Sequence, residues 1–277
     1  MYRVSKVLNN NGVIAIDMDE NQEYVILGKG VGFGKKVSQR FDKPQECTMY
    51  RLAQETERGS AKELVKGIEP EYLEIADAIL TEAQKVFGDS IDRGILFPLA
   101  DHISFAVARI RRNEQISNPL TEDIKVLFYS EFKVAETLKT ILKERLQIEI
   151  DDHEVGYVAL HIHSAIGDEK VSVAMQTARA VRECIDMIEK ATGKPIDVLS
   201  LSYNRLMNHM KYMVARASTG EKLNLDMNEY MLDQYPQAYE IAADICKNLE
   251  GCIGHKLDET EIGYLAMHIQ RVYKDAM

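Results

Sequence analysis

The pattern of apolar and polar positions separates a short front part of the chain from a long rear part. The front holds three apolar, β-branched runs, at residues 4–8, 12–16 and 23–28, divided by the polar turns NNN and DMDENQ. Short runs of this kind predict strands. Ahead of His102 and His209, apolar residues recur at three- and four-residue spacing, which predicts helices. We therefore expect a mostly α chain with a small N-terminal β module.

The rear part contains an internal repeat. Residues 154–162 read EVGYVALHI and residues 261–269 read EIGYLAMHI, so that Glu154 corresponds to Glu261. The same register relates His102 to His209 and the VAR triplets that follow them. Two copies of one domain explain this pattern. We expect two tandem homologous helical bundles of about 100 residues each.

Two stretches rich in charged and small residues, around residues 54–63 and 164–170, are typical of linkers. They predict three domains: a β module at 1–58 and helical domains at 64–169 and 171–277. A module of about 55 residues buries little apolar surface by itself, so we expect it to form a homodimer.

Each repeat also contains a pattern that is typical of a helix start. Asp151 with Glu154, and Asp258 with Glu261, have the spacing of an N-cap residue and its capping-box partner. In this interpretation both glutamates act locally, on the first turn of their own helix.

Composition and charge limit the class of protein. A hydrophobic share of 45% with 28% charged residues is typical of a globular chain. No stretch approaches eighteen apolar residues and the first residues lack signal-peptide features, so we expect a cytoplasmic protein without membrane insertion. The net charge is −10, but residues 1–58 hold nine Lys/Arg against eight Asp/Glu. A nucleic-acid partner would therefore bind the front part. The spacing of the four cysteines predicts free thiols.

Four of the seven histidines form two pairs that the repeat relates. His161 follows His102 at the same separation at which His268 follows His209. A single such histidine is more often a buried core residue, but four in register favour a function. Neutral imidazole is a nucleophile near neutral pH, so we expect these rings to accept phosphoryl groups. The added negative charge would then bias an interface between subunits.

An arginine follows the first histidine of each pair by seven residues, as Arg109 after His102 and Arg216 after His209. Seven residues are two helical turns, and helical side chains lean back toward the N-terminus. Arginine offers several donors to phosphate, so we predict that both arginines support the phosphoryl group. The alternative is an ordinary surface salt bridge.

The segment GKGVGFGKK, residues 28–36, matches neither the P-loop nor the dinucleotide-binding spacing of glycines. An RNA surface fits better, because glycine lets a ligand approach the backbone, Phe33 can stack on a base and Lys29 adds charge. The amides of residues 9–11 can read base edges. The alternative is a glycine-rich turn opposite an asparagine turn, without any ligand.

Taken together, these segments resemble the BglG/SacY-type antiterminators of sugar operons along nearly the whole chain. The segments that carry the resemblance are VSKVLNNNGVI, LGKGVGFGKK, DHISFAVAR, EVGYVALHIHSA, SYNRLMNHMKYMVAR and EIGYLAMHI. The front segment is more similar to the glucose-type branch. In that family a dimeric β module binds an RNA hairpin that overlaps a terminator, and two helical domains are phosphorylated by the sugar phosphotransferase system.

The resemblance implies a role for particular residues and partners. A sugar permease would phosphorylate the first helical domain and the histidine phosphocarrier protein would activate through the second. We expect no enzyme activity, cofactor or metal. The implied phosphoacceptors are His102, His161, His209 and His268, and the implied RNA contacts are Lys6, Asn11, Gly28, Lys29 and Phe33.

Two other classes of protein fit part of the pattern. A metal-dependent hydrolase would use Asp101 and His102 with His161 and His163, but ligands two residues apart suit a strand and this segment predicts a helix. The second copy also has Gln270 where His163 would repeat. A phosphotransferase-regulated transcription activator that binds DNA would share the helical repeats, but would need a helix-turn-helix at the front.

Overall fold

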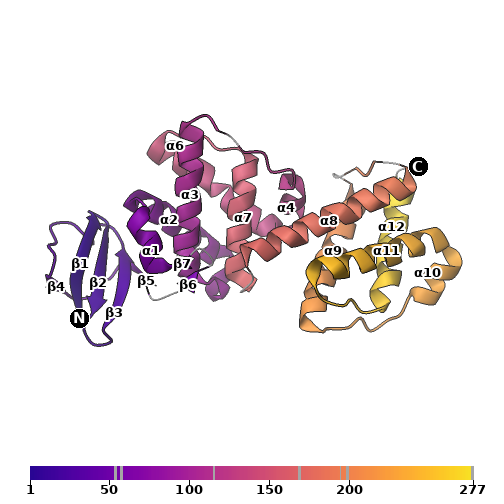
Figure 1. Cartoon of the computed structure of the whole chain (residues 1–277), viewed down its shortest axis with the longest axis horizontal. Helices are drawn as coiled ribbons and strands as arrows, with labels where there is room; N and C mark the ends of the chain where they lie inside the picture. The colour runs from indigo at the N-terminus through magenta and orange to yellow at the C-terminus, as the bar shows by residue number, and fades with distance from the viewer. Residues whose placement is uncertain are drawn as a thin grey trace. The chain divides into compact units, whose positions relative to one another are not determined.

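The structure, a computed structural model, divides into two compact units. The first unit comprises Met1–Asn118 with Ser130–Val171, and the second comprises Pro119–Tyr129 with Ser172–Met277. Figure 1 labels their helices and strands. The residues that the structure describes are 1–52, 55–56, 59–114, 116–167, 170–193, 195–197 and 200–275.

The front of the chain folds as an antiparallel five-stranded sheet with the order β4-β1-β2-β3-β5. The three predicted strands are confirmed as its centre. Two further strands, β4 and β5, lie at the edges, where short length and polar flanks left no apolar run for the sequence to reveal. The fully buried side chains of Val13, Ala15 and Ile26 form the core of the module. The strands are β1 Tyr2–Asn9, β2 Gly12–Asp17, β3 Gln22–Leu27, β4 Arg40–Phe41 and β5 Thr48–Arg51.

Both predicted linkers are more structured than expected. The first contains the paired strands β6 (Glu55–Thr56) and β7 (Gly59–Ser60), followed directly by α1 (Ala61–Gly67). Gln54, Glu57 and Arg58 of this linker lie outside the described residues. In the second, α7 (Asp152–Gly167) covers most of the predicted stretch, and residues 168–169 lie outside the described ranges.

Helices make up most of the other described residues, so the expectation of a mostly α protein with an N-terminal β module is confirmed. The helices of the first unit are α1, α2 Pro70–Phe87, α3 Leu96–Arg111, α5 Tyr129–Ala135, α6 Thr137–Leu146 and α7, with 3-10 turns η1 Gly88–Ser90 and η2 Arg93–Ile95. Those of the second are α4 Thr121–Leu127, α8 Val171–Thr192, α9 Leu201–Thr219, α10 Asn228–Gln234, α11 Pro236–Ile253 and α12 Thr260–Asp275.

The helix order reproduces the sequence repeat. In the register that relates His102 to His209, α3, α4 and α7 fall on α9, α10 and α12, and the pair α5–α6 falls on the single helix α11. One helix of the first copy, α4, belongs to the second compact unit. There the buried Tyr203 hydroxyl donates to Asp123 Oδ1 at 3.1 Å. Among the described helices, none has the length and apolar character that crossing a membrane requires.

Candidate functional site

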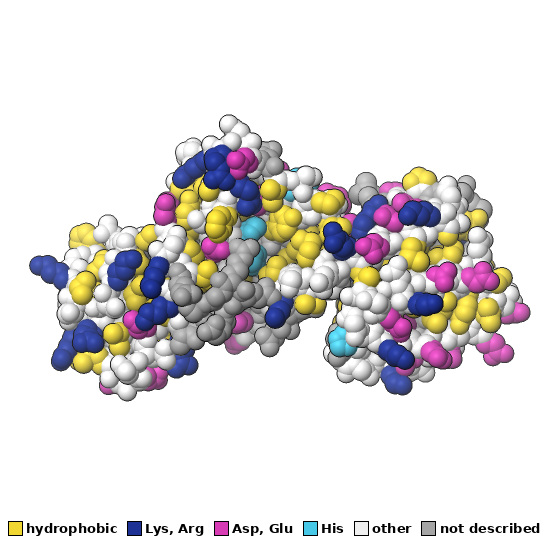
Figure 2. Space-filling view, in the orientation of Figure 1, with side chains coloured by type: hydrophobic (Ala, Val, Ile, Leu, Met, Phe, Trp, Pro, Cys, Tyr) yellow, Lys and Arg dark blue, Asp and Glu magenta, His cyan; other side chains and the backbone are white. Residues whose placement is uncertain are grey.

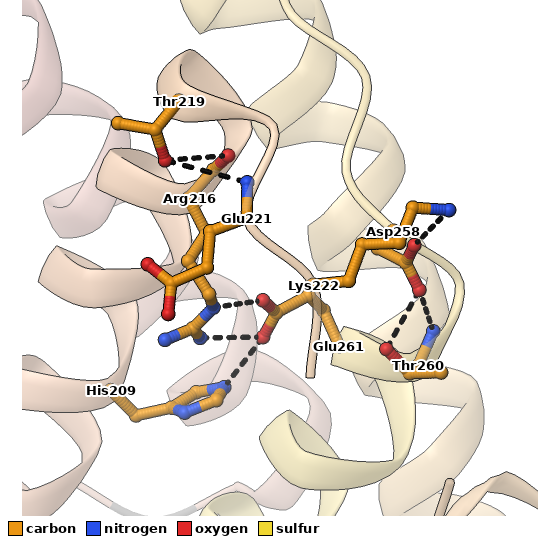
Figure 3. Close-up of polar contacts among 8 residues, drawn as sticks. All are labelled: His209, Arg216, Thr219, Glu221, Lys222, Asp258, Thr260 and Glu261. Atoms are coloured by element: carbon orange, nitrogen blue, oxygen red, sulfur yellow. Dashed lines mark hydrogen bonds and ion pairs between the residues drawn. The ribbon is translucent and has the colours of Figure 1, made fainter. Parts of the chain in front are cut away.

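The second helical repeat holds its two histidines face to face. His209 of α9 and His268 of α12 have ring centroids 4.9 Å apart and planes 26° apart. Glu261, in the first turn of α12, lies beside them, with its Oε2 atom 3.5 Å from His209 Nε2. The same carboxylate accepts two hydrogen bonds from Arg216, at 2.6 and 2.9 Å. Figure 3 shows the polar contacts of Glu261, which lies between the His209 imidazole and the Arg216 guanidinium.

The first repeat builds the same arrangement from α3 and α7. The rings of His102 and His161 are 5.3 Å apart at 47°. Glu154 Oε2 lies 3.5 Å from His102 Nε2, and Glu154 Oε1 accepts one hydrogen bond from Arg109 at 2.8 Å. The first copy thus has a single arginine–carboxylate hydrogen bond where the second has two.

Spacing along the helices explains why these four residues meet. One helix carries His and then Arg seven residues later, and its partner carries Glu and then His seven residues later. Residues seven apart lie on one face of a helix, so two helices that run antiparallel match histidine with histidine and arginine with glutamate. In each copy we call this set of residues the histidine relay; it comprises His102, Arg109, Glu154 and His161 in the first copy and His209, Arg216, Glu261 and His268 in the second.

The two glutamates are the functional candidates that the sequence interpretation missed. Half of the capping prediction is confirmed, because Asp151 Oδ1 accepts the backbone N–H groups of His153 and Glu154 at 3.0 and 3.2 Å. Asp258 accepts that of Thr260 at 3.1 Å. The other half is wrong, because the Glu154 carboxylate turns to Arg109 across the helix pair and not to its own N-cap. The seven-residue spacing from glutamate to histidine, present in both copies, was the available clue.

Burial keeps the second pair of imidazoles neutral. It lowers the pKa of His209 to about 3, with further lowering from His268 and Arg216. It also lowers the pKa of His268 to about 4, with contributions from Arg271 and Arg205. Both rings are therefore uncharged at neutral pH, which is the form that acts as a nucleophile.

The carboxylate of the first relay is held in its charged form. Burial raises the pKa of Glu154, but hydrogen bonds and charge from His102 and Arg109 outweigh that effect and leave the pKa below its usual value. The His102 and His209 side chains are only 11% and 9% exposed. Each ring lies beside a carboxylate that is itself paired with an arginine, so neither is enclosed by apolar side chains alone.

The hydrolase alternative finds no geometric support. His161 faces His102, whereas His163 Nδ1 lies 2.9 Å from Glu131 Oε1. Within the described residues, no three His, Cys, Asp or Glu side chains converge on a point where a metal ion could bind.

In the β module, the asparagine turn (residues 9–11) is hydrogen-bonded to the glycine-rich turn that begins at Gly28. The backbone N–H groups of Gly28 and Gly32 donate to the carbonyls of Asn11 and Asn10, both at 2.9 Å. A Cβ on Gly32 would lie 2.0 Å from the Asn9 carbonyl oxygen, so only glycine fits this approach. The interlock brings Asn11 and Gly28, two of the predicted RNA contacts, into direct contact.

The other predicted RNA contacts present their side chains to solvent. Phe33 is 73% exposed, which is unusual for an aromatic side chain, and Lys29 is exposed in the same turn. Lys6 is exposed on β1, opposite Ile14. Figure 2 shows several Lys and Arg side chains over the part of the molecule that Figure 1 labels β1 to β4. An exposed ring next to basic side chains is suited to base stacking with phosphate neutralisation.

Comparison with protein families identifies the β module and the two helical repeats. Residues 2–59 match the CAT RNA binding domain, and residues 77–165 and 182–272 match the PRD domain. The front strands therefore form an RNA-binding module, not the helix-turn-helix that a DNA-binding activator would need. One RNA-binding module with two PRD domains defines a regulatory protein and not an enzyme.

The chain belongs to the BglG/SacY-type family of transcription antiterminators. It is 30% identical to the "GlcA/glcB genes antiterminator" of Staphylococcus carnosus (strain TM300), over 97% of this chain and 94% of that protein. It is 28% identical to "Transcription antiterminator LicT" of Bacillus subtilis (strain 168), over 99% and 100%. The crystal structure of GlcT CAT-PRDI matches with a TM-score of 0.52 and 30% identity, over 60% of this chain and 98% of that one. These relatives support the glucose-type branch.

Proposed function

We propose that this antiterminator binds, as a homodimer in the cytoplasm, an RNA hairpin that overlaps a terminator. Components of the sugar phosphotransferase system phosphorylate its paired histidines. A sugar permease acts on His102 and His161 in a domain spanning 64–169, and the histidine phosphocarrier protein acts on His209 and His268 in a domain spanning 171–277. The β module at 1–58 carries the RNA contacts.

The observation that carries the regulatory half is the histidine relay, which both repeats build from equivalent residues. A phosphoryl group adds about 1.5 to 2 negative charges near pH 7. On His209 it would stand beside the Glu261 carboxylate, whose Oε2 atom is 3.5 Å from the ring. Like charges at this distance repel strongly when both are shielded from water. Arg216 can then form its hydrogen bonds either to the Glu261 carboxylate or to the phosphoryl group. When these hydrogen bonds move from the carboxylate to the phosphoryl group, α9 shifts relative to α12.

The two relays differ in ways that support separate roles. Beside Glu261 there is a cavity of about 170 Å³, lined also by Arg216, Lys222 and Lys256. The equivalent space beside Glu154 is about 10 Å³, which holds at most a single water molecule. In the second relay, Arg216 and Glu261 therefore have room to change position. In the first relay, Arg109 and Glu154 can change position only by displacing neighbouring side chains.

Phosphorylation is tested by incubating the full chain with the phosphocarrier, its kinase and a permease, then mapping phosphohistidine. The four variants His102→Ala, His161→Ala, His209→Ala and His268→Ala should each lose the label at the changed position. His255→Ala changes an exposed histidine outside both pairs and serves as the control. Label on His255 and on none of the four would refute the regulatory half.

RNA binding is tested by a gel shift of the full chain with the terminator-overlapping hairpin. Phe33→Ala should weaken binding roughly 10- to 100-fold, because stacking of a base on an aromatic ring contributes about 1–3 kcal/mol. The control is Val37→Ala, which removes a 63% exposed side chain from the same module and should leave affinity unchanged. Equal losses in both variants would argue against Phe33 as a stacking platform.

A further inference from the structure

The asparagine turn of the β module holds a carboxylate from the first helical domain. Asn9 Nδ2 donates to Glu74 Oε1 at 2.6 Å, and Asn11 Nδ2 donates to Glu74 Oε2 at 3.2 Å. Glu74 lies on α2, and both asparagines lie in the β1–β2 hairpin of the same compact unit. Two side-chain amides thus converge on the two oxygens of one carboxylate. We call the pair Asn9 and Asn11 the amide notch.

Contacts within the β module orient the amide notch. Asn9 Oδ1 accepts the backbone N–H of Asn11 at 2.8 Å, and Asn11 Oδ1 accepts that of Gly30 at 3.0 Å. Since both side-chain oxygens accept backbone protons, both NH₂ groups must point away from the hairpin. The notch is therefore a pair of donors fixed by the interlocked turns, and its orientation does not depend on Glu74.

Helix α2 is tied to the sheet at a second point. Asp77, one turn after Glu74, accepts hydrogen bonds from the Tyr50 hydroxyl of β5 and from Arg93 Nη2, the latter at 2.8 Å. Arg93 also donates to the Tyr50 hydroxyl at 2.8 Å. Asp77 and Arg93 together hold α2 where Glu74 reaches the amide notch.

The same helical segment borders another predicted RNA contact. Lys6 and Leu8 of β1 line a cavity of about 300 Å³ whose other wall is the α1–α2 connection, including Glu69 and Pro70. Of the five expected RNA-binding residues, Asn11 therefore contacts the first helical domain, and Lys6, although exposed, lines the cavity beside it.

We propose that the amide notch binds one oxyanion at a time, the Glu74 carboxylate in this conformation and an RNA phosphate oxygen in the complex. Carboxylate and phosphodiester oxygens both accept hydrogen bonds from amide N–H groups, and asparagine side chains commonly contact nucleic-acid phosphates. Glu74 is therefore an intramolecular competitor of RNA. This competition rests on the proposed function, because it assumes that the β module is the RNA-binding site.

The test measures hairpin affinity of the full chain with Glu74→Ala and, as a charge-matched control, Glu71→Ala on the same helix. Both variants remove one negative charge. Glu74→Ala also releases Arg145, whose Nη1 atom lies 3.7 Å from Glu74 Oε2, so Arg145→Ala and the Glu74→Ala/Arg145→Ala double variant are measured beside them. Losing two hydrogen bonds to a carboxylate should tighten binding by Glu74→Ala about tenfold over Glu71→Ala. Glu74→Gln keeps the side-chain size and should give a smaller gain. Equal affinities of the Glu74→Ala and Glu71→Ala variants would overturn the competition.

Two further measurements separate this proposal from others. In the free protein labelled with ¹⁵N-asparagine, Glu74→Ala should shift the side-chain NH₂ resonances of Asn9 and Asn11, and Glu71→Ala should not. Unmoved resonances would overturn Glu74 as the occupant. Sedimentation of the same samples should show an unchanged dimer fraction, and a gain in affinity that follows dimerisation alone would overturn the competition. A third outcome separates the two proposals. If no variant binds the hairpin but Glu74→Ala still shifts the Asn9 and Asn11 NH₂ resonances, the proposed function fails, and Glu74 is still the group bound in the amide notch.

Discussion

Replacing Arg216 by methionine tests whether the Arg216–Glu261 contact behaves as a buried ion pair. The Glu261 side chain is 2% exposed and that of Arg216 is 15% exposed, and two hydrogen bonds join them. Methionine retains much of the arginine stem but removes every donor. The substitution therefore leaves a desolvated carboxylate without the cation that stabilises it.

The burial of both groups decides the expected magnitude. Removing one partner from a buried pair costs about 3–5 kcal/mol, against about 0–1 kcal/mol for a pair at the surface. We expect Arg216→Met to destabilise the second unit by about 3–5 kcal/mol. Arg109→Met should cost less, about 2 kcal/mol, because Arg109 makes one hydrogen bond to Glu154 and is 25% exposed.

Urea unfolding at pH 7, followed by circular dichroism, measures the loss of stability. Hydrogen exchange of peptides from α9 and α12 assigns it to the helix pair. The double variant Arg216→Met/Glu261→Leu should recover most of the stability, because an apolar pair removes the uncompensated charge. A single-variant loss below about 1 kcal/mol, or a double variant no more stable than the single one, would refute a buried, mutually stabilising pair.

Two other predictions concern pH and packing. Because burial lowers the pKa of His209 to about 3 and of His268 to about 4 from 6.5, the unfolded chain binds more protons than the folded chain between about pH 4 and 6.5. The second unit should lose stability as pH falls through this window, by up to about 1.4 kcal/mol per pH unit for each ring, and urea midpoints that stay constant would contradict this. Gly32→Ala should destabilise the β module by about 3 kcal/mol and abolish hairpin binding, because its Cβ would clash with the Asn9 carbonyl oxygen. The control is Gly67→Ala, whose added Cβ would have no atom within 4 Å. It should change neither the urea midpoint nor the hairpin affinity.

Patterns along the chain were enough to predict the central strands and the duplicated helical domain. The β-branched runs identified β1, β2 and β3 because alternation and turn residues act over a few positions. The constant register between the repeats identified the two bundles because duplicated helices must keep the same apolar face. The same register paired His102 with His161 and His209 with His268, and the structure brings the ring centroids of these pairs to 5.3 and 4.9 Å.

The partners of these residues could not be obtained in that way. Glu154 fits a local capping pattern, so the sequence offers a sufficient explanation for it without any distant contact. Its actual partner, Arg109, lies 45 residues away and meets it only because two helices pack antiparallel. Glu74 is a still clearer case, since it has no distinctive neighbours in the sequence and meets Asn9 from 65 residues away.

The amino-acid sequence by itself determined the three central strands, that the helical domain occurs twice, and that its histidines recur in register, because each of these depends on patterns along the chain. Only the tertiary structure decided which charge each histidine and asparagine faces. Burial and packing set those contacts, and burial also lowers the pKa of His209 and His268 and makes the carboxylates costly to leave unpaired. The chemistry of the relay therefore belongs to pairs of helices, and no single segment contains it.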